Sequence, residues 1–193
     1  MPTPSPAKPA LISSTTSAEA ITAIRGLIRR GEYLAAYDAA EEAEQHPFNP
    51  GLSALALAEL RYLRALALTR SGGLLRATAE AEALKNSLPA DLPPALAEDI
   101  AALSARIAKE HALQAPPSER AALAATAAAA YEDVYRRLGR SYAGVNAATL
   151  WRIAGQVDQA QKLAREVIAL VDRESASLQG PVDPGFYWAW ATR

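Results

Sequence analysis

The same short pattern occurs three times along the chain: a glycine followed five residues later by an alanine. Glycine lets a chain reverse tightly, and alanine lets a second helix approach the first closely. Each alanine is followed four positions later, on the same helix face, by a further alanine. The alternative is that the pattern arises by chance in an alanine-rich chain. In all three copies, however, the glycine turn stands between two segments with helical spacing. The three copies are Gly31 to Ala36, Gly72 to Ala77 and Gly155 to Ala160, with Ala40, Ala81 and Ala164 as the further alanines.

Apolar residues at helical spacing, interrupted by glycine and proline, predict helices along most of the chain. Thr16 with Glu19 predicts a capping box for the first helix, and Asp91 before two prolines predicts the start of another. No alternating β-branched run predicts a strand. The predicted helices cover about 16–30, 32–46, 52–70, 74–88, 91–113 and 118–138, one passing through Asn146 to Ala154, and 157–177.

This repeated helix–turn–helix pattern resembles the tetratricopeptide repeat, whose usual period is about 34 residues. The spacing here is longer, because the interval from Gly31 to Gly72 exceeds one period and the interval from Gly72 to Gly155 exceeds two. The resemblance implies an all-α fold, a right-handed α–α superhelix of antiparallel helix hairpins. We expect a disordered leader rich in proline, serine and threonine at 1–16. The repeat domain would fill 17–193 and continue beyond the C-terminus in the full-length protein.

A narrower resemblance covers about Tyr142 to Trp188. It consists of A-G-V-N-A-A-T-L from Ala143, A-G-Q from Ala154, and the pair Tyr187-Trp188. This order is similar to the helical repeat region of apoptosis signal-regulating kinases, often called a TRAF-binding domain, and to its bacterial relatives. The resemblance implies a non-catalytic scaffold that lies beside an effector domain and controls its assembly or activity. The kinase motifs themselves are missing.

Composition excludes several classes of partner. The chain has 20 basic and 21 acidic residues, a net charge of −1, so no strong field attracts nucleic acid or an anionic membrane. No apolar run approaches the length of a membrane span, and there is no secretory signal or cysteine. We therefore expect a cytoplasmic protein, and the alanine-rich composition is typical of bacteria.

Catalytic and metal-binding signatures are missing from the sequence. There is no cysteine nucleophile and no G-x-S-x-G motif, and His46 and His111 stand apart in unlike settings. Gly72 and Gly73 lack the rest of a phosphate loop and are explained by a turn. We expect no catalytic residue, no metal and no cofactor, and hence no enzyme.

Six side chains in the C-terminal third are candidates for contacts with a protein or peptide partner, or with an effector domain of the same chain. Packing is the alternative for each, although aromatic and arginine side chains are common in binding hot spots. A second hypothesis is a small-ligand sensor or enzyme with a pocket between the C-terminal helices. A third is a homo-oligomerisation module that self-associates through its C-terminal aromatic face. The candidates are Arg140, Tyr142, Asn146, Trp151, Tyr187 and Trp188.

Overall fold

The computed structural model describes residues 17–45 and 52–176, including the backbone but not the side chains of the last three. Several predictions lie outside these residues: the leader at 1–16, the capping box through Thr16, and the candidate site residues Tyr187 and Trp188. His46 also lies outside them.

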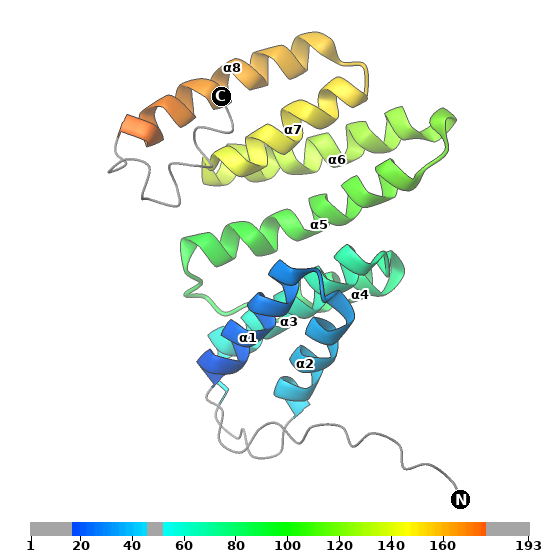
Figure 1. Cartoon of the computed structure of the whole chain (residues 1–193). Helices are drawn as coiled ribbons and strands as arrows, with labels where there is room; N and C mark the ends of the chain where they lie inside the picture. Colours follow the sequence, from blue (N-terminus) through cyan, green and yellow to red (C-terminus); the bar gives the residue numbers. More distant parts are fainter. Residues whose placement is uncertain (1–16, 46–51, 177–193) are drawn as a thin grey trace, which may run out of the picture.

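The described residues form eight helices that stack as four antiparallel pairs, so the predicted all-α superhelix of hairpins is confirmed (Figure 1). Each helix packs most extensively against its neighbours in sequence. The helices are α1 Ser17–Arg30, α2 Tyr33–Gln45, α3 Ala54–Ser71, α4 Leu74–Lys85, α5 Pro94–Gln114, α6 Pro117–Leu138, α7 Ser141–Ile153 and α8 Val157–Ala176.

The three predicted glycine turns join α1 to α2, α3 to α4 and α7 to α8. Gly31, Gly72 and Gly155 have φ values of 80°, 86° and 80°, a left-handed conformation that side chains with a Cβ atom adopt at a cost. The alanine five residues after each glycine is buried, with at most 5% of its surface exposed. The sequence pattern therefore marks both the reversal of the chain and the closest approach of the paired helices.

The fourth pair, α5 with α6, carries no glycine at its turn. Ala115 and Pro116 connect the two helices with extended backbone, and Pro117 opens α6, where its missing N–H needs no partner. This pair occupies the long interval between Gly72 and Gly155. The interval is thus explained by one additional hairpin.

Two predicted helix ends are wrong. The helix expected to start at Asp91 starts at Pro94 with Pro93 as its N-cap, because the prolines set the backbone angles of the first turn without a side-chain cap. Helix α4 ends at Lys85, before the predicted end at Leu88.

Buried side chains form two clusters that meet on α5. The first core joins α1 to α5 and receives Leu103 and Ile107 from that helix. The second core joins α5 to α8 and receives the small side chains Ala102, Ala105 and Ala112. Helix α5 therefore belongs to both halves of the array. None of the described helices is long and apolar enough to cross a membrane.

Candidate functional site

Polar and aromatic side chains follow the first helices of the four pairs, α1, α3, α5 and α7. Helix α3 contacts both α1 and α5, and side chains of α5 reach α7. We call this set the first-helix face. It consists of Arg25, Glu59, Asp99, Arg106, Lys109, Tyr142 and Asn146.

The face begins with an ion pair between α1 and α3. Arg25 donates from Nε to Oε1 of Glu59 at 2.9 Å, and its Nη2 lies 2.7 Å from the same oxygen. The side chains are 44% and 20% exposed, so solvent screens the pair. It orients both groups more than it stabilises the fold.

Arg106 is the centre of the face between α5 and α7. Its Nη2 donates to the hydroxyl of Tyr142, and its guanidinium lies 5.6 Å from the centre of that ring. The ring of Tyr142 packs edge-on against the buried Tyr131, with centroids 6.2 Å apart and planes at 78°. Tyr142 remains 39% exposed, so a predicted site residue presents an aromatic surface held by a cation on one side and a core ring on the other.

Asn146 lies one turn further along α7. Its Nδ2 donates to the backbone oxygen of Tyr142 at 3.0 Å, and its Oδ1 accepts from Nζ of Lys109 at 3.2 Å. The structural alternative expected a bond to the backbone preceding the helix. Instead, the amide bonds within its own helix and orients a lysine of α5.

Arg140 joins the loop before α7 to α5. Its Nε donates to Oε2 of Glu98 at 3.0 Å, and the side chain of Glu98 is only 9% exposed. The arginine side chain itself is 52% exposed. Arg140, Tyr142 and Asn146 thus all bond to side chains of one helix, or orient them.

Asp99 is a further residue of the face, and it lies near the buried core residue Tyr62. Burial raises the pKa of the Asp99 carboxyl, although Arg106, Arg25 and Arg140 all favour its charged form. Burial also raises the pKa of Tyr62, and the charge of Asp99 adds to the effect, so this phenol stays neutral at physiological pH. A half-buried carboxylate therefore lies in the electrostatic field of three guanidinium groups.

Trp151 has a different place. Its Nε1 donates to Oε2 of Glu132 at 2.8 Å, and the same oxygen accepts from Gln159 at 3.1 Å. Burial alone would raise the pKa of Glu132, but the hydrogen bonds from Trp151, Arg136 and Gln159 hold it below its usual range. The tryptophan ties α7 to α6 and α8, away from the first-helix face.

Sequence reasoning missed most of the residues on this face. Arg106 and Lys109 lie seven and ten positions after Asp99, a spacing that keeps all three on one side of a helix. That signal was present in the sequence, but helices generally carry such stripes on their solvent side. Only the contacts with Tyr142 and Asn146 distinguish this stripe from an ordinary one.

Metal binding finds no support in the described part of the chain, where no group of three or more His, Asp or Glu side chains could hold an ion. His111 lies near the end of α5, beside the turn at Gly72 and Gly73, and lines an open hollow there. The face offers guanidinium, ammonium, carboxylate and aromatic surfaces, which are groups for recognition.

Comparison with known proteins places the chain in a family. No curated protein and no solved structure matches it. The family model described as Tetratricopeptide Repeats-Sensor matches residues 32–151, which run from the first turn into α7 and include all of α5. The match bears out the predicted tetratricopeptide-like repeats, whereas the narrower likeness to apoptosis signal-regulating kinases stays a prediction. The chain belongs to the Tetratricopeptide Repeats-Sensor family.

Proposed function

We propose that the protein is a non-catalytic interaction scaffold that regulates an attached or partner effector in signalling or stress response. The observation that carries this proposal is the first-helix face, where side-chain bonds join α1 to α3 and α5 to α7, and Asp99 of α5 feels the charges of Arg25 and Glu59. Repeat arrays use such continuous surfaces to bind extended partners.

The chemistry of the face favours a polar protein segment with acidic side chains. Arg106 and Lys109 each use part of their donors on Tyr142 and Asn146, and guanidinium and ammonium groups have five and three donors. The remaining donors can bind carboxylates of a partner, while the exposed ring of Tyr142 gives apolar contact.

Two similarities support the regulatory part of the proposal. Repeat families of this type typically bind and do not catalyse, and the family description includes sensing. The resemblance of about 142–188 to the regulatory region of apoptosis signal-regulating kinases favours control of an effector. The effector domain and the cytoplasmic setting are part of the same proposal.

The test is affinity capture from cells of the source organism, with quantitative mass spectrometry of the bound proteins. Three baits are compared: the native chain, Arg106→Ala with Lys109→Ala, and a control with Arg152→Ala and Lys162→Ala. Arg152 and Lys162 are exposed and lie outside the first-helix face. Each variant removes one arginine and one lysine, so both lose the same charge. Circular dichroism establishes that all three baits are folded.

We expect the native and control baits to retain the same partner and the face variant to lose it. The captured protein is then purified, and its affinity should fall at least about tenfold with the face variant, which is about 1.4 kcal/mol. Retention by all three baits would refute the proposed surface. A dimer mass by light scattering, abolished by the face variant, would support self-association through the first-helix face in its place.

A further inference from the structure

The array contains two equivalent trios of helices, α2–α3–α4 and α4–α5–α6. In each trio the middle helix packs between two second helices of neighbouring pairs. Seven buried positions of α3 recur in α5 in the same order and with the same spacing. Those of α3 are Ala56, Ala58, Leu60, Tyr62, Leu63, Ala65 and Ala67. Those of α5 are Leu96, Glu98, Ile100, Ala102, Leu103, Ala105 and Ile107.

The flanking helices correspond in the same way, each pair with its own constant offset. The buried residues Ala36, Ala40 and Ala43 of α2 recur in α4 as Ala77, Ala81 and Leu84. The buried residues Leu74, Ala77, Ala81 and Leu84 of α4 recur in α6 as Ala124, Ala127, Tyr131 and Val134. Most buried positions of the first trio therefore have a buried equivalent in the second.

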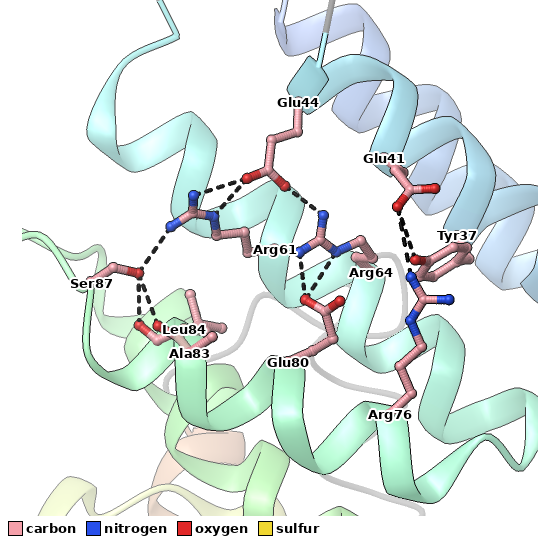
Figure 2. A network of polar contacts seen from close by, with 10 residues as sticks. All are labelled: Tyr37, Glu41, Glu44, Arg61, Arg64, Arg76, Glu80, Ala83, Leu84 and Ser87. Carbon is pink, nitrogen blue, oxygen red and sulfur yellow. Dashed lines mark hydrogen bonds and ion pairs between the residues drawn. The ribbon is translucent and has the colours of Figure 1, made fainter.

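An ion network fills the space between the outer helices of the first trio. Figure 2 shows Arg61 and Arg64 of α3 extending between α2 and α4. Glu44 accepts from Arg61 at 2.9 Å and from Arg64 at 2.7 Å, and Arg64 also pairs with Glu80. The side chains of Arg64, Glu44 and Glu80 are 15%, 18% and 16% exposed, so the network is largely enclosed.

The second trio has a cavity in the equivalent place. The offsets place Lys85 at the position of Glu44, Ala101 at Arg61, Ser104 at Arg64 and Ala130 at Glu80. All four replacements line one cavity of about 460 Å³. Two arginines and a glutamate have become alanine and serine, and the remaining glutamate has become lysine. Because these side chains are smaller, the space filled by the ion network in the first trio is open in the second. Because the carboxylates of Glu44 and Glu80 have no equivalent, the lysine stands beside this space.

Most of the lining of the cavity is apolar, and its polar residues are Lys85, Ser104, Asp133 and Arg137. Its walls come from leucine, isoleucine, valine and alanine side chains of the α4–α5 connection, α5 and α6. At the wall of the cavity, Oγ of Ser104 is buried within the protein and has no hydrogen-bond partner. The cationic side chains are Lys85 and Arg137; Lys85 pairs with Glu82 at 2.9 Å and Nε of Arg137 with Asp133 at 3.0 Å. Both keep donors that these partners do not use.

We propose that this cavity binds a small amphipathic anion, with an apolar body against the walls and a carboxylate held by Lys85 and Arg137. The volume lies in the range of small-ligand sites, which are mostly apolar with a few placed polar groups. An extended peptide fits this lining less well, because it brings two backbone hydrogen-bonding groups per residue against walls that are mostly apolar.

The site is independent of the first-helix face. At about 3.6 residues per turn, Ala101 and Ser104 lie on the opposite side of α5 from Asp99 and Arg106. Failure of one proposal therefore leaves the other intact, and the two tests use different variants and different probes.

The experiment uses the ¹⁵N-labelled full chain and three probes with matched parts. Decanoate supplies an apolar body with a carboxylate, decyltrimethylammonium the same body with a cation, and acetate the carboxylate alone. We expect decanoate to shift amide resonances of residues 97–105 and 130–138 in a saturable manner. The cation and acetate should bind at least about tenfold more weakly, a difference of about 1.4 kcal/mol.

Two kinds of variant locate the ligand. Ser104→Leu or Ala101→Leu fills the cavity and should weaken decanoate at least about tenfold. The control Ala129→Leu adds the same bulk at an exposed position of α6 next to the lining residue Ala130, and should leave affinity unchanged. Replacing both Lys85 and Arg137 by glutamine should weaken decanoate about fivefold, as expected for exposed ion pairs, without affecting decanol.

The spectrum of each variant reports its fold independently of binding, so an unfolded variant is recognised and replaced by the other filling variant. Resonance shifts outside the cavity, equal binding of the cationic probe, or unchanged affinity in both filling variants would overturn the proposal. So would an absence of saturable shifts up to the solubility limit of decanoate.

Discussion

A Cβ atom at Gly144 would lie 2.4 Å from Cγ2 of Val167 and 2.9 Å from Cδ2 of Tyr135. Both neighbours are buried, so the clash has little room to relax. We expect Gly144→Ala to lower the free energy of unfolding by about 1–3 kcal/mol, the usual cost of overpacking a core. Urea unfolding followed by circular dichroism measures the change.

Gly26 is the matched control for this substitution. It lies within α1, and a Cβ atom there would come no closer than 3.4 Å to Nη1 of Arg30, the end of a flexible side chain. Gly26→Ala should therefore stabilise the protein by about 0.5–1 kcal/mol through helix propensity. Equal effects of the two substitutions would show that Gly144 is not a packing requirement.

Glu132 gives the fold a pH dependence. Its folded-state pKa is depressed by bonds from Trp151, Arg136 and Gln159, so its contribution to stability exists above its unfolded pKa and is lost as the pH falls through the folded value. We expect Glu132→Gln to lower the urea midpoint at pH 7 and to have a smaller effect at pH 3.

The neighbouring Asp133 tests this explanation. Its side chain is 64% exposed and pairs with Arg137 of the same helix. Asp133→Asn should change the midpoint little at either pH. A loss of stability in Glu132→Gln that is the same at both pH values would mean that shape, not charge, is responsible.

Single residues show where sequence reasoning stops. Gly31 and Ala36 were predictable because their requirement is local: a left-handed turn and a close contact within one hairpin. The partners of Tyr142 and Asn146 were not, because Arg106 and Lys109 lie 36 and 37 residues away. Which turn of α5 faces α7 depends on how the pairs stack.

At the scale of elements, the network between α2, α3 and α4 should stabilise the first half of the array (Figure 2). Arg64→Met would leave the enclosed carboxylate of Glu80 without its arginine and would leave Glu44 with Arg61 alone. We expect a loss of about 1–3 kcal/mol in urea unfolding, the cost of leaving buried polar groups without partners. Removing both carboxylates as well, by Glu44→Gln and Glu80→Gln, should restore part of the lost free energy of unfolding.

Arg76→Met serves as the control for this network. Its side chain is 60% exposed and lies 3.7 Å from Glu41, so its loss should cost at most about 1 kcal/mol. A cost equal to that of Arg64→Met would contradict the importance of enclosure.

Elements were largely predictable because helical spacing and chain-breaking residues are local signals. The pair α5 with α6 was predicted as two helices but not as a repeat, since its turn uses Ala115 and Pro116 where the others use glycine. The equivalence of its positions with the preceding trio became evident only from burial.

For the whole molecule, two cores that share α5 imply two regions of separate stability. Leu60 and Leu150 are both 1% exposed, one in each core. Leu60→Ala should increase amide hydrogen exchange mainly in α1–α4, and Leu150→Ala mainly in α6–α8, each at a cost of about 2–5 kcal/mol. Exchange that increases uniformly over the described helices in both variants would indicate a single cooperative unit.

The stacked arrangement was implied by the tetratricopeptide resemblance, but neither the first-helix face nor the cavity followed from it. Both depend on which side chains meet between pairs. The cavity in particular exists because small residues stand where the preceding trio has arginines. In the sequence alone, such small residues predict only a helix.

The glycine turns also offer a way to watch the array change shape. Nothing lies within 4 Å of a Cβ atom built at Gly31 or Gly155, so the space beside these turns is open. The neighbouring Glu32 and Gln156 are exposed, and the chain contains no cysteine, so cysteines introduced there would be the only sites for thiol-reactive dyes. A donor and an acceptor at these positions would report, by energy transfer, the stretch of the superhelix between its first and last described hairpins. Titrating decanoate into the doubly labelled protein would show whether filling the cavity lengthens or shortens the distance between the two dyes, and so whether the superhelix opens or tightens.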